Sequence, residues 1–237
     1  MSVILSQIGA LELLLTILLA VICLFFARTA PLAARIEGSP FDLAVVLNFK
    51  GPHSPASIRE MERETGLILK SSGVRLHWGI WGADSPAVSN NLVVMTFTGS
   101  CEFNQAPARS EEVGPFAVTR IADGKLLPFA EVDCDRVVRS ARGAMSTADS
   151  AWADRLVGRA MGRVVAHELV HMLTGSRRHG TEGVAQPALS GEELIGESLR
   201  LSMLDIYRVR QELKDPRGSF FTAPGEADVH DSVHQAN

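Results

Sequence analysis

The chain has 237 residues, of which 46% are hydrophobic, and its formal net charge is −4 at pH 7. This length suits one good-sized domain with an appendage. Proteins that bind nucleic acids gain most of their affinity from basic side chains, so the mild acidity argues against a nucleic-acid partner.

Residues 8–27 form an almost unbroken apolar run, interrupted by Glu12 and Thr16. About twenty apolar residues are enough for a helix to span a bilayer core, so residues 1–28 are predicted to be a transmembrane anchor or an export signal. No Lys or Arg precedes the run, whereas Arg28 and Arg35 follow it. By the positive-inside rule this bias would leave the body in the cytoplasm.

That charge bias rests on two arginines, and we expect the domain on the extracytoplasmic side of the membrane. Pro31 would directly follow the first possible cleavage point after Ala30. We therefore favour an uncleaved single-pass anchor, with secretion after signal cleavage as the alternative.

The first half of the body predicts a strand, a helix and two further strands. Residues 29–40 hold prolines and small residues and indicate a linker. Residues 41–49 read as a buried strand, and residues 56–72 carry the apolar stripe of a helix. Residues 74–81 and 91–98 are again typical of strands, and a strand, a helix and a strand in this order predict a right-handed crossover with a parallel pair.

A hairpin is predicted next, from residues 116–121 and 126–133. The turn between them contains Asp123 and Gly124, and Asp-Gly is a strong hairpin signal. Pro128 suggests that its own strand, 126–133, lies at a sheet edge, since proline cannot donate a ladder hydrogen bond.

A long helix is predicted to begin near Ser146 and to continue to Gly175. Gly158 and Gly162 lie four residues apart on one face of it. Glycine weakens a helix, so we expect this face to pack closely against the sheet.

Inside this helix lies an HExxH motif made by His167, Glu168 and His171. The two histidines are one helical turn apart, so both imidazoles project from the same face and can hold a single cation. From the adjacent position the carboxylate of Glu168 can act as a general base towards a water on the metal without being a ligand itself.

A catalytic zinc site also needs a third protein ligand and an open position for water. His179 is the first candidate, because Gly175 can end the helix and the next residues can bring the chain back towards the metal.

An acid from residues 190–197 is the alternative third ligand. Glu192, Glu193 and Glu197 are in range along the chain. However, Ser190 with Glu193 has the pattern of a helix capping box, which already explains that glutamate.

The motif and the histidine after it resemble the zincin metalloproteases, and among them the metzincins, whose pattern is HExxHxxGxxH. Gly175 lies one residue later and His179 two residues later than in that pattern. Residues 183–186, where a Met-turn would follow, contain no methionine, and Met203 lies inside a later helical pattern.

The resemblance covers roughly residues 41–186 and implies an α+β, zincin-like domain. Such a domain has a mixed twisted sheet with an antiparallel edge hairpin, packed on a backing helix and on an active-site helix. One strand of the hairpin would pair with an extended peptide substrate. The alternative is an ordinary hairpin without a peptide role.

The function implied by the resemblance is that of a membrane-anchored or exported zinc metalloendopeptidase. Zn²⁺ would be held by His167, His171 and His179, and Glu168 would be the general base in the hydrolysis of a peptide or protein substrate. Two alternatives belong to other classes: a zinc-binding structural or regulatory membrane protein without turnover, and a membrane-tethered binding module whose motif is accidental.

Ser190 is predicted to begin a last helix that runs to about Lys214. The metalloprotease domain would then span residues 41–214, and the polar tail 215–237 is expected to be disordered.

Two cysteines lie in the body of the chain, Cys101 and Cys134, each at the end of a strand-like segment. Neither belongs to a CxxC pair, so they do not indicate a metal site. They would form one disulfide in an exported domain, or remain reduced thiols otherwise.

Overall fold

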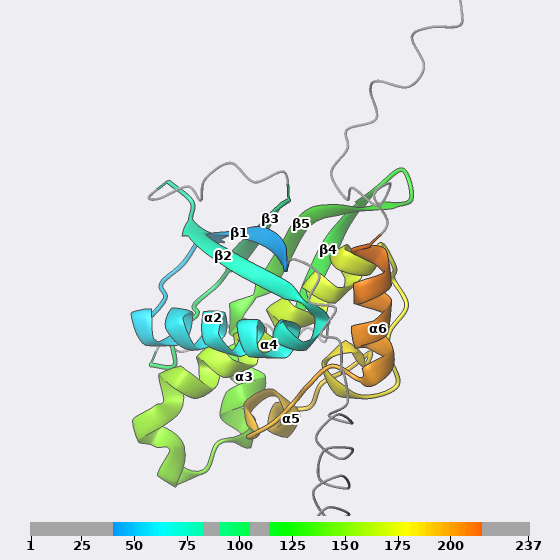
Figure 1. Cartoon of the computed structure of the whole chain (residues 1–237). Helices are drawn as coiled ribbons and strands as arrows, with labels where there is room; N and C mark the ends of the chain where they lie inside the picture. Colours follow the sequence, from blue (N-terminus) through cyan, green and yellow to red (C-terminus); the bar gives the residue numbers. More distant parts are fainter. Residues whose placement is uncertain (1–39, 83–90, 105–113, 215–237) are drawn as a thin grey trace, which may run out of the picture. The chain divides into compact units, whose positions relative to one another are not determined.

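Five strands form one mixed sheet in the computed structural model, which describes residues 40–82, 91–104 and 114–214 (Figure 1). The strands are β1 (Phe41–Phe49), β2 (Val74–Ile80), β3 (Leu92–Thr98), β4 (Ala117–Ala122) and β5 (Lys125–Asp133). Their order is β2-β1-β3-β5-β4. β1 is parallel to β2 and β3, β5 is parallel to β3, and β4 is antiparallel to β5. The α+β class and the parallel β1–β2 pair are therefore confirmed.

The hydrophobic core lies along the central strands. Five consecutive residues of β1, from Leu43 to Leu47, are buried. A run without polar alternation is what a strand covered on both faces requires, which is why the branched sequence of residues 41–49 predicted this element correctly.

The β4–β5 hairpin has the predicted turn but a different edge strand. Asp123 and Gly124 both have positive φ, 50° and 75°, as a two-residue turn between twisted strands requires. β4 is the edge of the sheet, whereas β5 lies between β3 and β4, so the edge position inferred from Pro128 is wrong. The proline is tolerated for two reasons. It precedes Phe129, which is the first residue of β5 that pairs with β3. It also lies where the register between β4 and β5 shifts.

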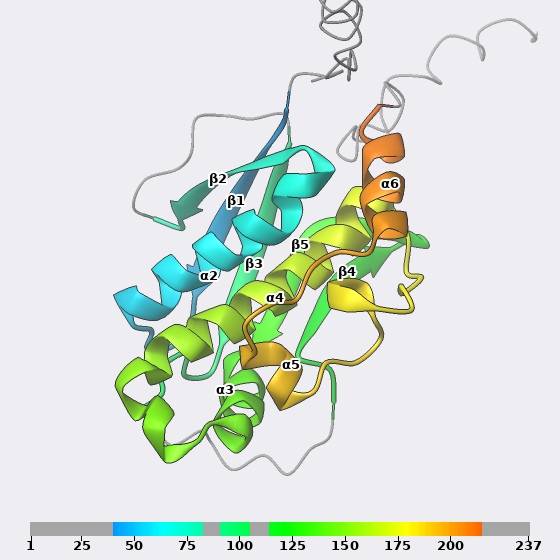
Figure 2. The same ribbon diagram turned by 60° about the horizontal axis from the view of Figure 1, so that its bottom comes forward.

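The helical elements are α2 (Pro55–Leu69) with its extension η1 (Lys70–Ser72), α3 (Cys134–Ala144), η2 (Thr147–Trp152), α4 (Ala153–Thr174), η3 (Gly183–Ala185), α5 (Gly191–Ile195) and α6 (Met203–Glu212). Figure 2 shows α2 and α4 side by side on one face of the sheet. α4 also contacts β4 and β5, so it runs beneath the hairpin end of the sheet.

The two glycines of α4 face helix α2, and the expectation that they face the sheet is wrong. A Cβ at Gly158 would overlap the carbonyl oxygen of Ser57, and one at Gly162 would lie 2.8 Å from that of Met61. The Thr65 hydroxyl donates to the Gly162 carbonyl at 3.0 Å. The glycines therefore allow two helix backbones to approach closely enough for such hydrogen bonds.

Two helical segments differ from the sequence-based expectation. α3 was not anticipated; Asp133 caps it by accepting a hydrogen bond from the Arg136 backbone N–H at 2.9 Å. α4 proper begins at Ala153, after the 3₁₀ turn η2, rather than near Ser146.

The single last helix predicted from Ser190 to Lys214 is two helices. Ser190 does form a capping box with Glu193, but α5 stops at Gly196. The carbonyl of Gly196 accepts a hydrogen bond at 2.7 Å from Arg163 of α4, whose side chain is buried. Ser202 then caps α6 by accepting from the Asp205 backbone N–H. The break between α5 and α6 is therefore set by capping residues, which an apolar pattern does not include.

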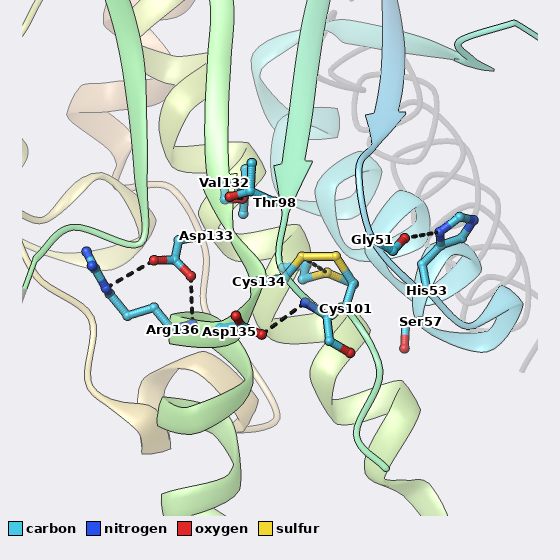
Figure 3. The surroundings of a disulfide bond; sticks show 12 residues. Gly51, His53, Ser57, Thr98, Cys101, Val132, Asp133, Cys134, Asp135 and Arg136 are labelled. Carbon is cyan, nitrogen blue, oxygen red and sulfur yellow. Dashed lines mark hydrogen bonds and ion pairs between the residues drawn. A yellow bond between two sulfur atoms is a disulfide. The ribbon is translucent and has the colours of Figure 1, made fainter. Parts of the chain in front are cut away.

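A disulfide joins Cys101 to Cys134, with their Cα atoms 4.9 Å apart (Figure 3). Of the two states that the sequence left open, the structure has the bridged one. It ties the segment after β3 to the first residue of α3, beside a hydrogen bond from the Ser100 backbone N–H to the Asp135 carboxylate at 2.9 Å.

The predicted anchor, residues 1–28, the linker up to residue 39, and the tail 215–237 lie outside the described residues. Among the helices that are described, none combines the length and the apolar content needed to cross a bilayer.

Candidate metal centre

Three histidines converge at the C-terminal end of α4. His167 and His171 lie one turn apart, with ring centroids 4.7 Å from each other. Gly175 ends the helix with a φ of 56°, and the chain returns so that the His179 ring lies 5.2 Å from that of His167 and 4.9 Å from that of His171. One ring nitrogen from each residue lies within 4.8 Å of the other two. The structure thus brings together the three side chains that the sequence singled out.

Backbone carbonyls fix the orientation of the two helical histidines. Nδ1 of His167 lies 2.8 Å from the carbonyl oxygen of Val184, and Nδ1 of His171 lies 2.7 Å from that of Ser176. A carbonyl can only accept, so each Nδ1 carries the hydrogen and, in the neutral ring, each Nε2 presents a lone pair.

These two Nε2 atoms lie 3.0 Å from each other. Two lone pairs at this distance repel unless a cation or a proton lies between them. Two ligands at 2.0–2.1 Å from one tetrahedral metal ion would be roughly 3.3 Å apart, so the observed spacing fits a shared metal ion. The Nε2 atoms of His167 and His171 are therefore oriented as a metal site requires.

The protonation of the cluster also favours metal binding. Burial lowers the pKa of His167 below its ordinary value of 6.5. The pKa of His179 is lowered as well, by burial and then by the charge of His171. Because metals bind the neutral imidazole, lowered pKa values keep these ligands available to a lower pH.

The sequence did not reveal that the carbonyls of Ser176 and Val184 orient the two helical histidines. The Val184 carbonyl belongs to η3. Gly183, the first residue of η3, has a φ of 70° and lies so close to the Arg200 carbonyl that there is no room for a Cβ. Backbone acceptors carry no side-chain signature, although the glycine is a signal that the chain turns sharply there.

Glu168 is held by Thr119, a residue that no sequence motif indicates. Its carboxylate Oε2 accepts a hydrogen bond from the hydroxyl of Thr119 on β4, at 2.6 Å. The two side chains are buried, at 6% and 7% exposure. The alternation of β4 could have indicated this, because Thr119 is a polar residue on the inward-facing side of the strand.

A cleft of about 660 Å³ lies over the cluster, between the edge strand β4 and helix α4. The three histidines and Glu168 line it together with Arg177 and Gln186. The rest of its wall is mainly apolar and includes Phe116, Val118, Ile121, Leu126, Val164 and Leu189.

The alternative acidic ligands do not join the cluster. Within the described part of the chain, the grouping of possible metal ligands contains the three histidines and none of Glu192, Glu193 and Glu197. The Glu193 carboxylate accepts hydrogen bonds from the Ser190 backbone N–H and from the Gln186 amide, at 2.8 and 2.6 Å. Those hydrogen bonds lower its pKa and account for its position.

Comparison with known proteins does not assign a family. No protein-family model matches the chain, and a search of curated proteins gives no significant match.

Proposed function

We propose that this chain is a membrane-anchored or exported zinc metalloendopeptidase with a zincin-like fold. The observation that carries the proposal is the convergence of three imidazoles, two of them oriented by backbone carbonyls, beside a buried carboxylate in a cleft under an antiparallel edge strand. His167, His171 and His179 are the proposed zinc ligands, and Glu168 is the proposed general base.

The number of donors supports a catalytic rather than a structural site. Structural zinc sites are usually closed by four protein ligands, whereas catalytic sites have three and leave one position for water or substrate. The cluster found among the described residues has three donors and opens onto a cleft. Imidazole nitrogens suit zinc, although they also suit copper, nickel and iron.

Zinc bound there would lower the pKa of a water molecule and polarise a substrate carbonyl. The chain supplies the proton transfer: Glu168 takes a proton on its carboxylate and returns it to the departing amine nitrogen. The Val184 and Ser176 carbonyls hold the rings of His167 and His171 in one tautomer. The cleft wall is mainly apolar, and a bound substrate that displaced water from it would strengthen the electrostatic interactions within it.

The position of β4 supports a peptide as substrate. An edge strand presents backbone N–H and C=O groups that an extended peptide can pair with, as in β-strand addition. β4 is the edge strand on the side of the sheet that borders the cleft. A peptide paired there would pass the histidine cluster, and the apolar wall favours substrates with an apolar side chain near the cleaved bond.

The Cys101–Cys134 disulfide supports an extracytoplasmic domain. Stable disulfides form in oxidising compartments and are rare in the cytosol. This argument outweighs the two arginines that follow the apolar N-terminal run, and it agrees with an exported domain tethered by that run.

The proposal is tested by the Glu168→Gln variant of the full-length protein in detergent. We expect unchanged zinc content and a peptidase rate about 10²- to 10⁴-fold below wild type, since general-base catalysis contributes a factor of this size. Glu197→Gln, in the segment that could have supplied the rival ligand, is the control and should retain the wild-type rate. A Glu168→Gln protein as active as wild type would refute the assignment.

A further inference from the structure

The hydrogen bond between Thr119 and Glu168 joins two elements that are distant in sequence. Thr119 lies on β4 and Glu168 on α4, 49 positions further along the chain. Thr119 is paired with Ala130 of β5, so the position of its backbone is fixed by the sheet. Threonine is branched at Cβ and has few accessible rotamers, so its hydroxyl is a rigid donor.

This hydrogen bond is short. O–H···O bonds are about 2.5–3.0 Å long, and the observed distance between the two oxygens is 2.6 Å. Both groups are almost fully buried, in a cleft with mainly apolar walls. A hydrogen bond in such surroundings is stronger than one in water, so it restricts the carboxylate more.

The hydrogen bond also gives the two carboxylate oxygens of Glu168 different roles. Oε2 of Glu168 accepts from Thr119, which leaves Oε1 to receive a proton. A glutamate side chain has three rotatable bonds, and a general base must be held close to the productive geometry. Thr119 supplies this restraint from the edge strand that borders the cleft.

We propose that Thr119 is a positioning residue that fixes the carboxylate of Glu168 for proton transfer and thereby couples the edge strand to the base. This inference rests on the proposed peptidase function. Thr119 does not itself exchange a proton with the substrate; its role is to fix the base before the substrate arrives. Losing such a supporting partner usually costs about 10- to 100-fold in activity.

Thr119→Val removes the hydroxyl and keeps the shape, whereas Thr119→Ser keeps the hydroxyl. In the zinc-loaded full-length protein we expect Thr119→Val to lower kcat by about 10- to 100-fold with KM little changed, and Thr119→Ser to recover most of the rate. Thr98→Val is the matched control. Thr98 lies on β3, and its hydroxyl donates to the Val132 carbonyl of β5 at 3.3 Å. We expect this control to have the wild-type rate.

A second readout does not depend on turnover. Acetohydroxamate chelates a metal ion and offers a hydroxyl to a neighbouring carboxylate, so its affinity for the zinc-loaded protein, measured by calorimetry, reports the position of Glu168. We expect Thr119→Val to weaken it by about 10-fold. Glu168→Gln should weaken it too, and adding Thr119→Val to that variant should cause no further loss, because the two side chains act as one unit.

Three results would overturn the inference on Thr119 alone. They are a Thr119→Val protein with wild-type kcat and hydroxamate affinity, a Thr119→Ser protein as impaired as Thr119→Val, and a full additional loss in the double variant. In each case, the proposed peptidase function would still hold if the wild-type protein binds zinc and cleaves peptides. If wild-type protein binds zinc without cleaving peptides, the hydroxamate measurement still decides the role of Thr119. Wild-type protein without zinc would overturn both.

Discussion

At the scale of single residues, burial of an imidazole links folding to pH. His167 has a lowered pKa because it is buried, and His179 has a lowered pKa for the same reason together with the charge of His171. In the unfolded chain both would titrate near 6.5. Below that pH the unfolded chain therefore binds protons that the folded chain excludes, so acid favours unfolding.

We predict that the metal-free protein loses unfolding free energy as the pH falls below about 6.5, with little change from this cause at higher pH. Urea unfolding after removal of metal by a chelator, at pH 7.5 and pH 5.5, measures the difference. His167→Gln cannot take up this proton and should lose less stability between the two conditions. Equal losses in the variant and in wild type would contradict the assigned cause.

At the scale of elements, the close contact of α2 and α4 determines where the helix that carries His167 and His171 lies. We predict that Gly162→Ala lowers the free energy of unfolding by about 1–3 kcal/mol, because its Cβ would lie 2.8 Å from the backbone carbonyl of Met61. Urea titration measures the change, and the peptidase rate should fall with it if α4 moves away from β4.

The control for that substitution is Gly66→Ala in α2. No atom lies within 4 Å of a Cβ at this position, so alanine should stabilise the protein by about 0.5–1 kcal/mol through helix propensity. The two substitutions are chemically identical and differ in surroundings. A Gly162→Ala protein as stable as Gly66→Ala would show that the helices do not need this close approach.

The elements that could be predicted from sequence are those with a strong local pattern. β1 follows from its apolar run, the hairpin from Asp123-Gly124, and the end of α4 from Gly175. α3 was missed although Asp133 is a good cap, since its buried residues are few and lie directly after a strand. The last helix was predicted too long because the break after Gly196 depends on Arg163, a contact across the fold.

At the scale of the whole molecule, the disulfide closes the loop that contains the edge hairpin. Cys101 and Cys134 are 33 positions apart, and β4 and β5 lie between them. Closing a loop of this length should stabilise the fold by about 3–4 kcal/mol, mainly by restricting the unfolded chain.

We predict that replacing both cysteines by alanine lowers the free energy of unfolding by about that amount under non-reducing conditions. Guanidinium titration of the double variant and of oxidised wild type gives the difference. Reduction of wild type should reproduce most of it. With the bridge intact, denatured wild-type protein isolated without reductant should titrate one free thiol per chain, that of Cys23. Three free thiols would contradict both the bridge and the extracytoplasmic location that it supports.

The order of the sheet could not be read from local patterns, because it depends on which strands meet after long connections. β3 lies between β1 and β5, and the position of Pro128 suggested the wrong edge strand. In the site, too, some residues follow from local patterns and others depend on contacts between distant parts of the chain. His167, Glu168 and His171 follow from one helical turn, and a glycine turn suggested His179, whereas Thr119 and the carbonyls of Ser176 and Val184 arrive from elsewhere in the fold.

The most direct test is the metal content of the full-length protein, purified without added chelator and measured by mass spectrometry, with His179→Ala and His77→Ala beside it. We predict one zinc ion per chain in wild type and in His77→Ala, whose histidine contacts Asp42 on another part of the sheet. His179→Ala should bind zinc more than about 100-fold more weakly, since losing a ligand costs more than losing a supporting partner. Wild-type protein without stoichiometric metal, or His179→Ala protein that binds zinc as tightly as wild type, would contradict the three-histidine site.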